Sequence, residues 1–369
     1  MNAKVLIIGG GVTGMHTALV LADLGISSFI VEKKDCLGGR VRFLSRTFPF
    51  FTDDGFHNGA EFTQDLETLV KKCNRIDVKL NTQVECVSGQ FPCFDVRLKD
   101  GSQYQVGGIV VATGFEPFDP SSMGEYGYRR YANVITAPEL EWMLNINGPT
   151  RGELRRPSDS GPVSRMAIIF CVGSRNRRLG APFCSRICCS YSTKQALTVM
   201  EKSPKTEVCC FYMDVRTYDR GFEEMYSLAQ ERGVKYIRGR VSGCKEMDDK
   251  KIHLRAEHTL IQKMYANEFD LVSLSTGMRP CLEADLLAKT LGIQRSDDGF
   301  FSSRAWFRFP HDSTRMGILI AGCATGMKPI RNCMMDGAAA ASRMASLFRQ
   351  QSSVCCDTSN GTNSETVTL

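Results

Sequence analysis

The sequence predicts an α/β protein with two nucleotide-fold halves. Short apolar runs alternate with stretches of helical spacing, which is typical of parallel sheets covered by helices. The apolar strands predicted at 109–114 and 270–277 both end in Thr-Gly, and this internal echo indicates two related halves. The halves differ at their ligand turns, because the first has clustered glycines where the second has cysteines.

Residues 5–32 predict a strand–turn–helix–strand unit that binds a dinucleotide. The apolar run at 5–8 leads into Gly9-Gly10-Gly11-Val12-Thr13-Gly14, and the second strand ends in Glu32. In this pattern the first glycine makes a tight turn, the second admits a pyrophosphate to the backbone, and the third lets helix and strand pack closely. Glu32 is expected to accept hydrogen bonds from ribose hydroxyls.

The residues after Glu32 indicate which dinucleotide binds. Lys33 and then Gly38-Gly39-Arg40 follow the acid. This spacing resembles the flavoproteins with two dinucleotide-binding domains, whose first unit holds FAD. The resemblance implies that the Gly-Gly backbone passes the ribityl chain and pyrophosphate, with Arg40 near that phosphate. A plain loop at 38–39 is the alternative.

Two further segments complete the predicted flavin half. Strands of a meander are expected at 82–89 and 94–98, with Val84 placed to contact the adenine through its backbone. Ala112-Thr113-Gly114 ends an apolar strand, and its small side chains would let a cofactor pack against the tip.

The cysteine-rich segment gives the second half its predicted chemistry. Four of the sixteen cysteines fall within nineteen residues, after the apolar run at 166–170, in the order C-x12-C-x3-C-C. Cys171, Cys184, Cys188 and Cys189 could converge at the tip of a strand and the start of a helix. Thiolates suit iron–sulfur clusters or zinc, and this spacing matches neither the common zinc patterns nor the usual ferredoxin runs. We favour an iron–sulfur cluster over zinc, and over cysteines buried for packing alone.

The last predicted strand, 317–323, returns the chain to the flavin half. It ends in Gly322-Cys323, and a long helix is expected from Ile330 to Phe348. In the two-domain flavoproteins the matching strand ends in Gly-Asp, so the resemblance leaves the ribityl contact of Cys323 to its backbone or to water. The helix N-terminus would face the pyrimidine edge of the flavin, where its partial positive charge favours the anionic reduced form.

Composition limits the remaining classes of function. The net charge of +6 is scattered, which argues against nucleic-acid binding, and no apolar run is long enough to predict a membrane span. No secretory leader is predicted, and sixteen cysteines without one favour a reducing, cytoplasmic location.

Taken together, the chain resembles the A-type flavoprotein subunits of heterodisulfide reductase and their shorter bacterial relatives. The segments that carry the resemblance are Gly9–Gly14 with Glu32 and Gly38-Gly39, 112–117, 124–128, 131–136, 171–196, 211–214, 237–241 and 321–324. The resemblance implies a thioredoxin-reductase-like fold whose second domain is modified to hold one [4Fe–4S] cluster, ligated by Cys171, Cys184, Cys188 and Cys189, close to FAD.

The predicted site contains cofactor ligands and no catalytic residue. The residues expected to contact FAD are Gly9, Gly11, Val12, Thr13, Gly14, Glu32, Lys33, Gly38, Gly39, Arg40, Val84, Ala112, Thr113, Gly114, Gly322, Cys323 and Ile330. The expected divisions are the flavin domain at 1–120 and 284–348, a crossover and linker at 121–164, the cluster domain at 165–283 and a disordered tail at 349–369.

Two departures from the family pattern narrow the expected function. No C-x2-C-x2-C run exists, so the inserted ferredoxin domains of the long subunits are missing, and residues 50–55 lack the cysteines found there in many relatives. We therefore expect an oxidoreductase subunit that splits flavin electron pairs into single electrons for iron–sulfur and thiol-handling partner subunits in sulfur metabolism. A homodimer within a larger complex is expected, and NAD(H) remains an open partner.

Three alternatives remain. The chain could serve a quinone-interacting membrane-associated complex, whose flavoprotein subunit has a similar length. It could be a self-contained NAD(P)H-dependent flavin disulfide reductase, but no two of its cysteines are separated by two residues. It could also be a flavin-bound scaffold with zinc at the cysteines.

Four arginines crowd the cysteine loop, namely Arg175, Arg177, Arg178 and Arg186. We expect their charge to raise the reduction potential of the cluster or to dock an acidic partner.

Overall fold

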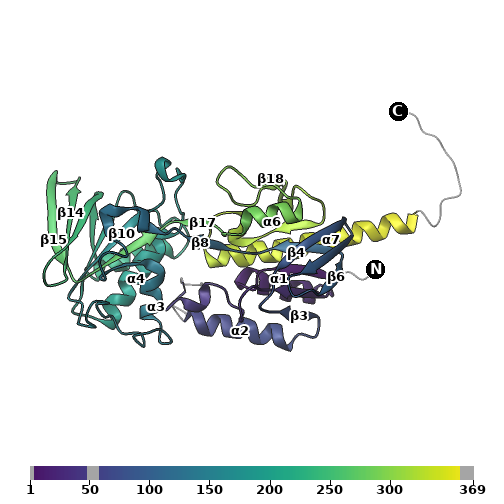
Figure 1. Ribbon diagram of the computed structural model, residues 1–369, viewed down its shortest axis with the longest axis horizontal. Helices are drawn as coiled ribbons and strands as arrows, with labels where there is room; N and C mark the ends of the chain where they lie inside the picture. Colours follow the sequence, from purple (N-terminus) through teal and green to yellow (C-terminus); the bar gives the residue numbers. More distant parts are fainter. Residues whose placement is uncertain (1–3, 48–57, 358–369) are drawn as a thin grey trace.

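The computed structural model describes residues 4–47 and 58–357, which form two lobes joined side by side (Figure 1). Residues 50–55, where the sequence departs from the family pattern, lie outside the described ranges. The first lobe is built on a seven-stranded sheet of order β18-β19-β20-β7-β1-β2-β3. Its strands are β1 (Val5–Ile8), β2 (Ser28–Val31), β3 (Ile76–Lys79), β7 (Gly108–Val111), β18 (Ser303–Ala305), β19 (Phe309–Ser313) and β20 (Ile318–Ile320).

Successive side chains of β1 point to opposite faces of the sheet, and each face is covered by a different layer. Val5 and Ile7 face one core with the helices α1 (Val12–Asp23), α2 (Gly59–Lys72) and α7 (Ile330–Asp357). Leu6 and Ile8 face a second core with α6 (Ala284–Leu291) and a three-stranded meander. The meander strands are β4 (Val84–Gln90), β5 (Cys93–Leu98) and β6 (Gln103–Val106). A parallel sheet covered on both faces needs such a continuous apolar run, which is what the sequence shows at 5–8.

The second lobe repeats this design around a parallel sheet of order β12-β11-β10-β16-β9. Its strands are β9 (Val134–Thr136), β10 (Arg165–Val172), β11 (Glu207–Tyr212), β12 (Lys235–Arg238) and β16 (Leu271–Thr276). One face packs on α3 (Ala137–Leu144), α4 (Cys188–Lys202) and α5 (Phe222–Glu231). The other face packs on the antiparallel strands β13 (Val241–Glu246), β14 (Ile252–His258) and β15 (Lys263–Phe269).

Paired strands form one connection between the lobes. β8 (Phe115–Pro117) pairs antiparallel with β17 (Met278–Pro280), and these strands follow β7 of one lobe and β16 of the other. Short 3-10 turns complete the described chain at η1 (Val41–Phe43), η2 (Pro120–Ser122), η3 (Gly124–Tyr126), η4 (Arg177–Leu179) and η5 (Gly322–Thr325).

A buried ion pair between α3 and α4 of the second lobe also contacts the first lobe. Lys194 Nζ lies 2.5 Å from Glu141 Oε1 and donates to the carbonyl oxygen of Arg46. Glu141 Oε2 accepts from both the backbone N–H and the hydroxyl of Ser45. Both charged side chains are nearly inaccessible, and burial lowers the pKa of Lys194 while Glu141 raises it. Charges taken out of water in this way depend on each other for solvation.

Two elements differ from the sequence expectation. β9 lies inside the stretch expected to be crossover and linker, yet it pairs with β16 and extends the second sheet. A three-residue strand is too short to show a recognisable period in the sequence. α7 also continues to Asp357, beyond the expected helix end at residue 348, although residues 349–357 are polar.

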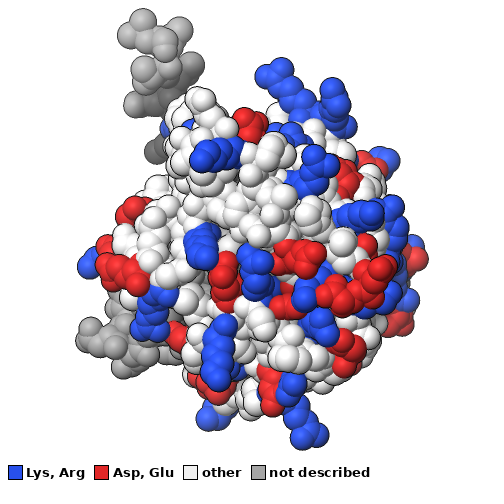
Figure 2. All heavy atoms as spheres, turned by 90° about the vertical axis from the view of Figure 1, so that its left-hand side faces the viewer, with Lys and Arg blue, Asp and Glu red and all other residues white. Residues whose placement is uncertain are grey.

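The described surface has two features that bear on function. In the described residues no helix is long and apolar enough to cross a membrane. The outer face of the second lobe carries lysines and arginines intermixed with acidic residues (Figure 2).

Candidate cofactor site

The glycine turn after β1 has the geometry that a phosphate-binding turn requires. A Cβ at Gly14 would lie 1.9 Å from the carbonyl oxygen of Gly9, so only glycine lets α1 start this close to the strand. A Cβ at Gly11 would meet only the Cα of Gly39, 4.0 Å away. The backbone at Gly11 therefore faces open space at the start of α1, where N–H groups and the helix dipole favour an anion.

The polar residues after β2 surround this turn. Glu32 is buried, and its carboxylate accepts from the N–H groups of Gly10 (2.7 Å) and Lys34 (3.0 Å). Gly38 forms an isolated parallel bridge with Gly11, so the Gly-Gly segment lies against the glycine turn. Lys33 instead points to an ion pair with Glu283 at the lobe surface.

Arg40 connects the turn to the strand that leaves the lobe. Its Nε donates to the carbonyl oxygen of Phe115 at 2.8 Å, and its guanidinium pairs with Glu116. Burial lowers the pKa of Arg40 while Glu116 raises it. Arg40 thus lies beside Ala112–Gly114, just after β7. To bind a phosphate there, its guanidinium would have to leave the Glu116 carboxylate or pair with both anions at once.

The carboxyl ends of β7 and β20 bring the later predicted residues to the same edge. β1 pairs with β7, and β7 with β20, all in parallel, so Ala112–Gly114 and Gly322-Cys323 lie near the glycine turn. A Cβ on Gly322 would meet Thr13 Oγ1 at 2.3 Å, which shows how closely η5 approaches α1. In open α/β sheets ligands bind at this edge, where connections leave in opposite directions. Ile330 begins α7, and Val84 begins β4.

The corresponding turn of the second lobe starts with backbone strain. β10 has an irregular register against β16 between Ile169 and Val172. Cys171 lies in this irregularity with a φ of 62°, a left-handed conformation that is costly for a residue with a Cβ. A bulge of this kind redirects a side chain, and strained backbone collects at functional sites.

The structure brings three of the four predicted cluster ligands together. Cys188 is hydrogen-bonded to both Cys171 and Cys189, and Cys188 and Cys189 open α4. The pKa of Cys171 falls to about 7, through the hydrogen bond from Cys188 and the charge of Arg175, against the effect of burial. The same contacts lower the pKa of Cys189 and raise that of Cys188. A helix N-terminus near thiols also favours thiolate, the form that ligates metals.

Cys184, the fourth predicted ligand, has a different contact. Its Sγ accepts from the backbone N–H of Arg186 at 3.3 Å, in the loop before α4. Within 4–47 and 58–357, no group of three or more His, Cys, Asp or Glu side chains has a geometry that could hold a metal ion. Neither a three-thiolate nor a four-thiolate metal site is therefore preformed in the described residues.

Several buried polar atoms without partners belong to residues that lie close in sequence to the predicted ligands. The hydroxyls of Ser174, Ser185 and Ser190 and the Nη1 of Arg175 are buried without a hydrogen-bond partner. Arg175 Nη2 donates to Asp214 at 2.7 Å, and Cys189 Sγ contacts the carbonyl oxygen of the same Asp214. Unsatisfied buried donors carry a free-energy cost, and donors near thiolates are the groups that hydrogen-bond cluster sulfurs. This donor set fits an iron–sulfur cluster better than an apolar core.

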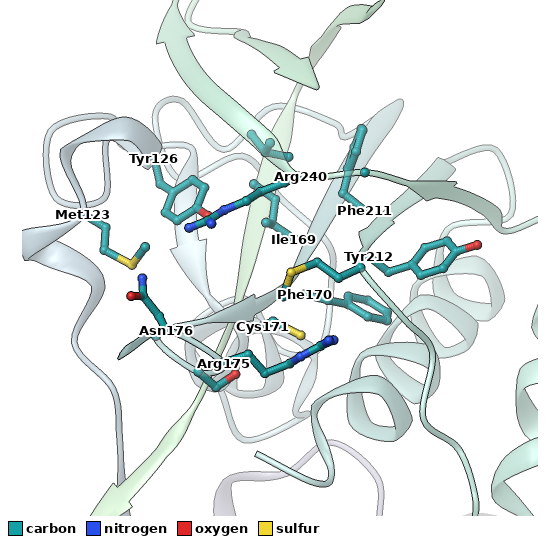
Figure 3. A pocket seen from close by; sticks show the side chains of 15 residues that line it. Met123, Tyr126, Ile169, Phe170, Cys171, Arg175, Asn176, Phe211, Tyr212 and Arg240 are labelled. Atoms are coloured by element: carbon teal, nitrogen blue, oxygen red, sulfur yellow. The ribbon is translucent and has the colours of Figure 1, made fainter. Parts of the chain in front are cut away.

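A pocket opens at this turn and reaches Cys171 (Figure 3). Residues from four segments line it, including Met123, Tyr126, Cys171, Arg175, Phe211 and Arg240. The pocket lies at the carboxyl ends of β10 and β11, the edge where a nucleotide-fold lobe binds its ligand. Its cations make it suited to an anionic group.

Sequence reasoning missed three polar residues at the flavin edge. Asp336, on α7, accepts from the N–H of Gly322 at 3.1 Å and pairs with Lys328. Cys333, also on α7, lies against Cys323. All three follow the last strand in the sequence, but no short motif points to them.

Comparisons with known proteins agree with this geometry. The family model described as pyridine nucleotide-disulphide oxidoreductase matches residues 3–146. The structure resembles T. acidophilum thioredoxin reductase with a TM-score of 0.65 and 17% identity, covering 93% of this chain and 97% of that one. Lactococcus lactis thioredoxin reductase gives 0.63 and 16%, covering 94% and 99%. The predicted thioredoxin-reductase-like α/β fold is confirmed.

Curated relatives match almost the whole chain. It is 34% identical to the A-type subunit of the H2:CoB–CoM heterodisulfide, ferredoxin reductase of Methanothermobacter marburgensis, covering 94% of this chain and 64% of that one. It is 30% identical to the A-type subunit of the ferredoxin/F420H2-dependent CoB–CoM heterodisulfide reductase of Methanosarcina acetivorans, covering 94% and 53%. The chain thus spans less than two thirds of the length of these relatives.

Proposed function

We propose that this chain is an FAD- and [4Fe–4S]-containing electron-transfer subunit of a heterodisulfide-reductase-like complex. The premise is its similarity, over 94% of its length, to the A-type subunit of a heterodisulfide reductase. The observation that carries the proposal is the contrast between the two ligand turns: an open glycine turn after β1, and a strained, thiol-bearing turn after β10. When bound, the flavin would supply two-electron chemistry and the cluster one-electron chemistry.

The first lobe supplies the residues for FAD. The N–H groups at Gly11–Thr13 would receive the pyrophosphate, and Glu32 retains acceptor capacity for ribose hydroxyls beside its two backbone donors. Arg40 would balance phosphate charge. The family match over residues 3–146 supports this cofactor.

The second lobe supplies thiolates and donors. Cys171, Cys188 and Cys189 would ligate the cluster together with Cys184, which must join them for a four-cysteine set. Ser174, Ser185 and Ser190 would donate to cluster or cysteine sulfur, which tunes a reduction potential. The bulge at Cys171 and the start of α4 hold three of these ligands on rigid elements.

The finer assignments extend the same proposal. We place the chain in a multi-subunit complex with iron–sulfur and thiol-handling partners in sulfur metabolism, as a homodimer within that complex, and in the cytoplasm. NAD(H) would have to reach the flavin without a glycine turn after β10, because Cys171 and Arg175 occupy that turn.

Anaerobic purification followed by cofactor analysis tests the proposal. We expect one FAD, four iron and four acid-labile sulfide per chain, with an EPR signal of a reduced [4Fe–4S] cluster. Zinc in place of iron would favour the scaffold alternative. A chain that retains FAD and holds no metal after oxygen-free preparation would contradict the cluster half of the proposal.

A further inference from the structure

A pair of sulfur atoms outside the set of proposed cluster ligands lies just after β20, at the carboxyl end of the first sheet. The Sγ atoms of Cys323, in η5, and Cys333, in the first turns of α7, are 3.4 Å apart. Both residues are buried, at 7% and 5% exposure. Nine residues lie between them in the sequence, so the pair lacks the short Cys-x-x-Cys spacing by which redox pairs are usually found.

Apolar side chains, a backbone carbonyl and two charged groups surround this pair. Met278 and the partly buried Phe115, Ile187 and Met327 pack around the two thiols. The carbonyl oxygen of Lys328 lies 3.5 Å from Cys323 Sγ and 3.9 Å from Cys333 Sγ. The charged groups facing the pair are Lys328 and Asp336, which form an ion pair with each other.

The two thiols are inequivalent. The hydrogen bond from Cys333, followed by the Lys328 backbone and charge, lowers the pKa of Cys323, while the same hydrogen bond and burial raise that of Cys333. One sulfur is thus favoured as thiolate and the other as thiol, the arrangement in which one attacks and the other releases a proton.

We propose that Cys323 and Cys333 form a redox-active dithiol that closes to an intramolecular disulfide and exchanges its electron pair with the flavin. The inference rests on the proposed flavin site for its electron acceptor. In the oxidising direction two S–H bonds break and one S–S bond forms. The two electrons and two protons pass to the oxidised flavin, which becomes the two-electron-reduced form.

Geometry favours this step. A disulfide bond is about 2.05 Å long, so the sulfurs need to approach by only ~1.4 Å. Cys323 lies directly after Gly322, where a Cβ would collide with Thr13 of the glycine turn. A flavin held at this edge of the sheet would be an electron acceptor of suitable chemistry in the same lobe.

Differential alkylation tests whether the disulfide forms. The purified chain is oxidised with diamide, blocked with N-ethylmaleimide in denaturant, and digested with trypsin, which cleaves after Arg331 and so separates the two cysteines. Mass spectrometry should find the Cys323 and Cys333 peptides linked, and the link should disappear with dithiothreitol. Cys333→Ser should abolish it, whereas Cys281→Ser should leave it unchanged. Cys281 is a matched control, since it is buried in the same lobe and contacts Thr113 Oγ1.

Anaerobic dithionite titration of the oxidised holoprotein tests exchange with the flavin. The wild type should consume two more electrons per chain than Cys333→Ser, with FAD and iron contents equal in both. An unlinked pair of peptides, or equal electron counts at full FAD occupancy, would overturn the inference. A chain without FAD would refute the proposed function instead, and the peptide measurement would still decide whether the pair closes.

Discussion

The two lobes place different chemistry on the same strand-to-helix turn. After β1 the backbone itself is the ligand: Gly11 faces open space, and α1 begins directly behind it. After β10 the backbone is bent by a bulge, and α4 begins with two cysteines, of which Cys188 contacts Cys171. A nucleotide needs N–H groups and room, whereas a metal cluster needs soft side chains held at fixed points. Under the proposed function, the two lobes keep a ligand at the same place in the fold and change the kind of ligand.

The largest expected effect is the loss of iron when one cysteine thiol is removed from the second turn. Cys188 contacts two of the other predicted ligands, so Cys188→Ser should reduce iron to a small fraction of the wild-type content. FAD content should stay at the wild-type level, because the flavin turn lies in the other lobe. Cys210→Ser is the control, since Cys210 is buried in β11 and is not a predicted ligand. Equal iron in both variants would break the comparison.

Breaking the buried ion pair should show how far the two lobes depend on each other. Lys194→Met leaves the Glu141 carboxylate buried without its cation, and we expect a loss of about 3–5 kcal/mol in unfolding free energy. Chemical denaturation measures this loss. The double variant Lys194→Met/Glu141→Gln should recover part of it, because no uncompensated charge remains. A single variant as stable as the wild type would mean that this buried pair contributes little to the stability of the protein.

A methyl group at the glycine turn should weaken FAD binding without unfolding the lobe. A Cβ at Gly11 meets only the Cα of Gly39 at 4.0 Å, so Gly11→Ala is tolerated by the fold and occupies the space proposed for phosphate. We expect at least a tenfold rise in the FAD dissociation constant, about 1.4 kcal/mol. Fluorescence titration of the apoprotein measures it. Gly124→Ala is the control, since a Cβ there also meets open space, away from the turn. An unchanged affinity would remove Gly11 from the site.

The sequence predicted the parts of this molecule that local patterns encode. The glycine turn with Glu32 and the adjacent cysteines could be recognised from the sequence alone, because each is a short motif with its own chemistry. The strand β9 was missed because three residues are too few to show a hydrophobic period. The ion pair of Lys33 with Glu283 was missed because it joins residues 250 positions apart. The contacts between Cys323 and Cys333, and between Asp336 and Gly322, arise only when α7 folds back onto η5. Convergence of Cys184 with the other three thiols stays a prediction.

The smallest expected effect concerns the exposed charges of the cysteine loop. Arg177 and Arg178 are exposed in η4, whereas Arg175 pairs with Asp214 and Arg186 contacts Tyr218. Replacing both exposed residues with Gln should change the unfolding free energy by less than about 0.5 kcal/mol, because surface charges interact weakly through water. An acidic partner should nevertheless associate more slowly, and the salt dependence of its association rate should shrink. Stopped-flow association at two ionic strengths measures the second effect, and redox titration measures the cluster potential. Were both unchanged, the loop would be a solvated basic surface, and the second ligand turn would differ from the first in its thiols alone.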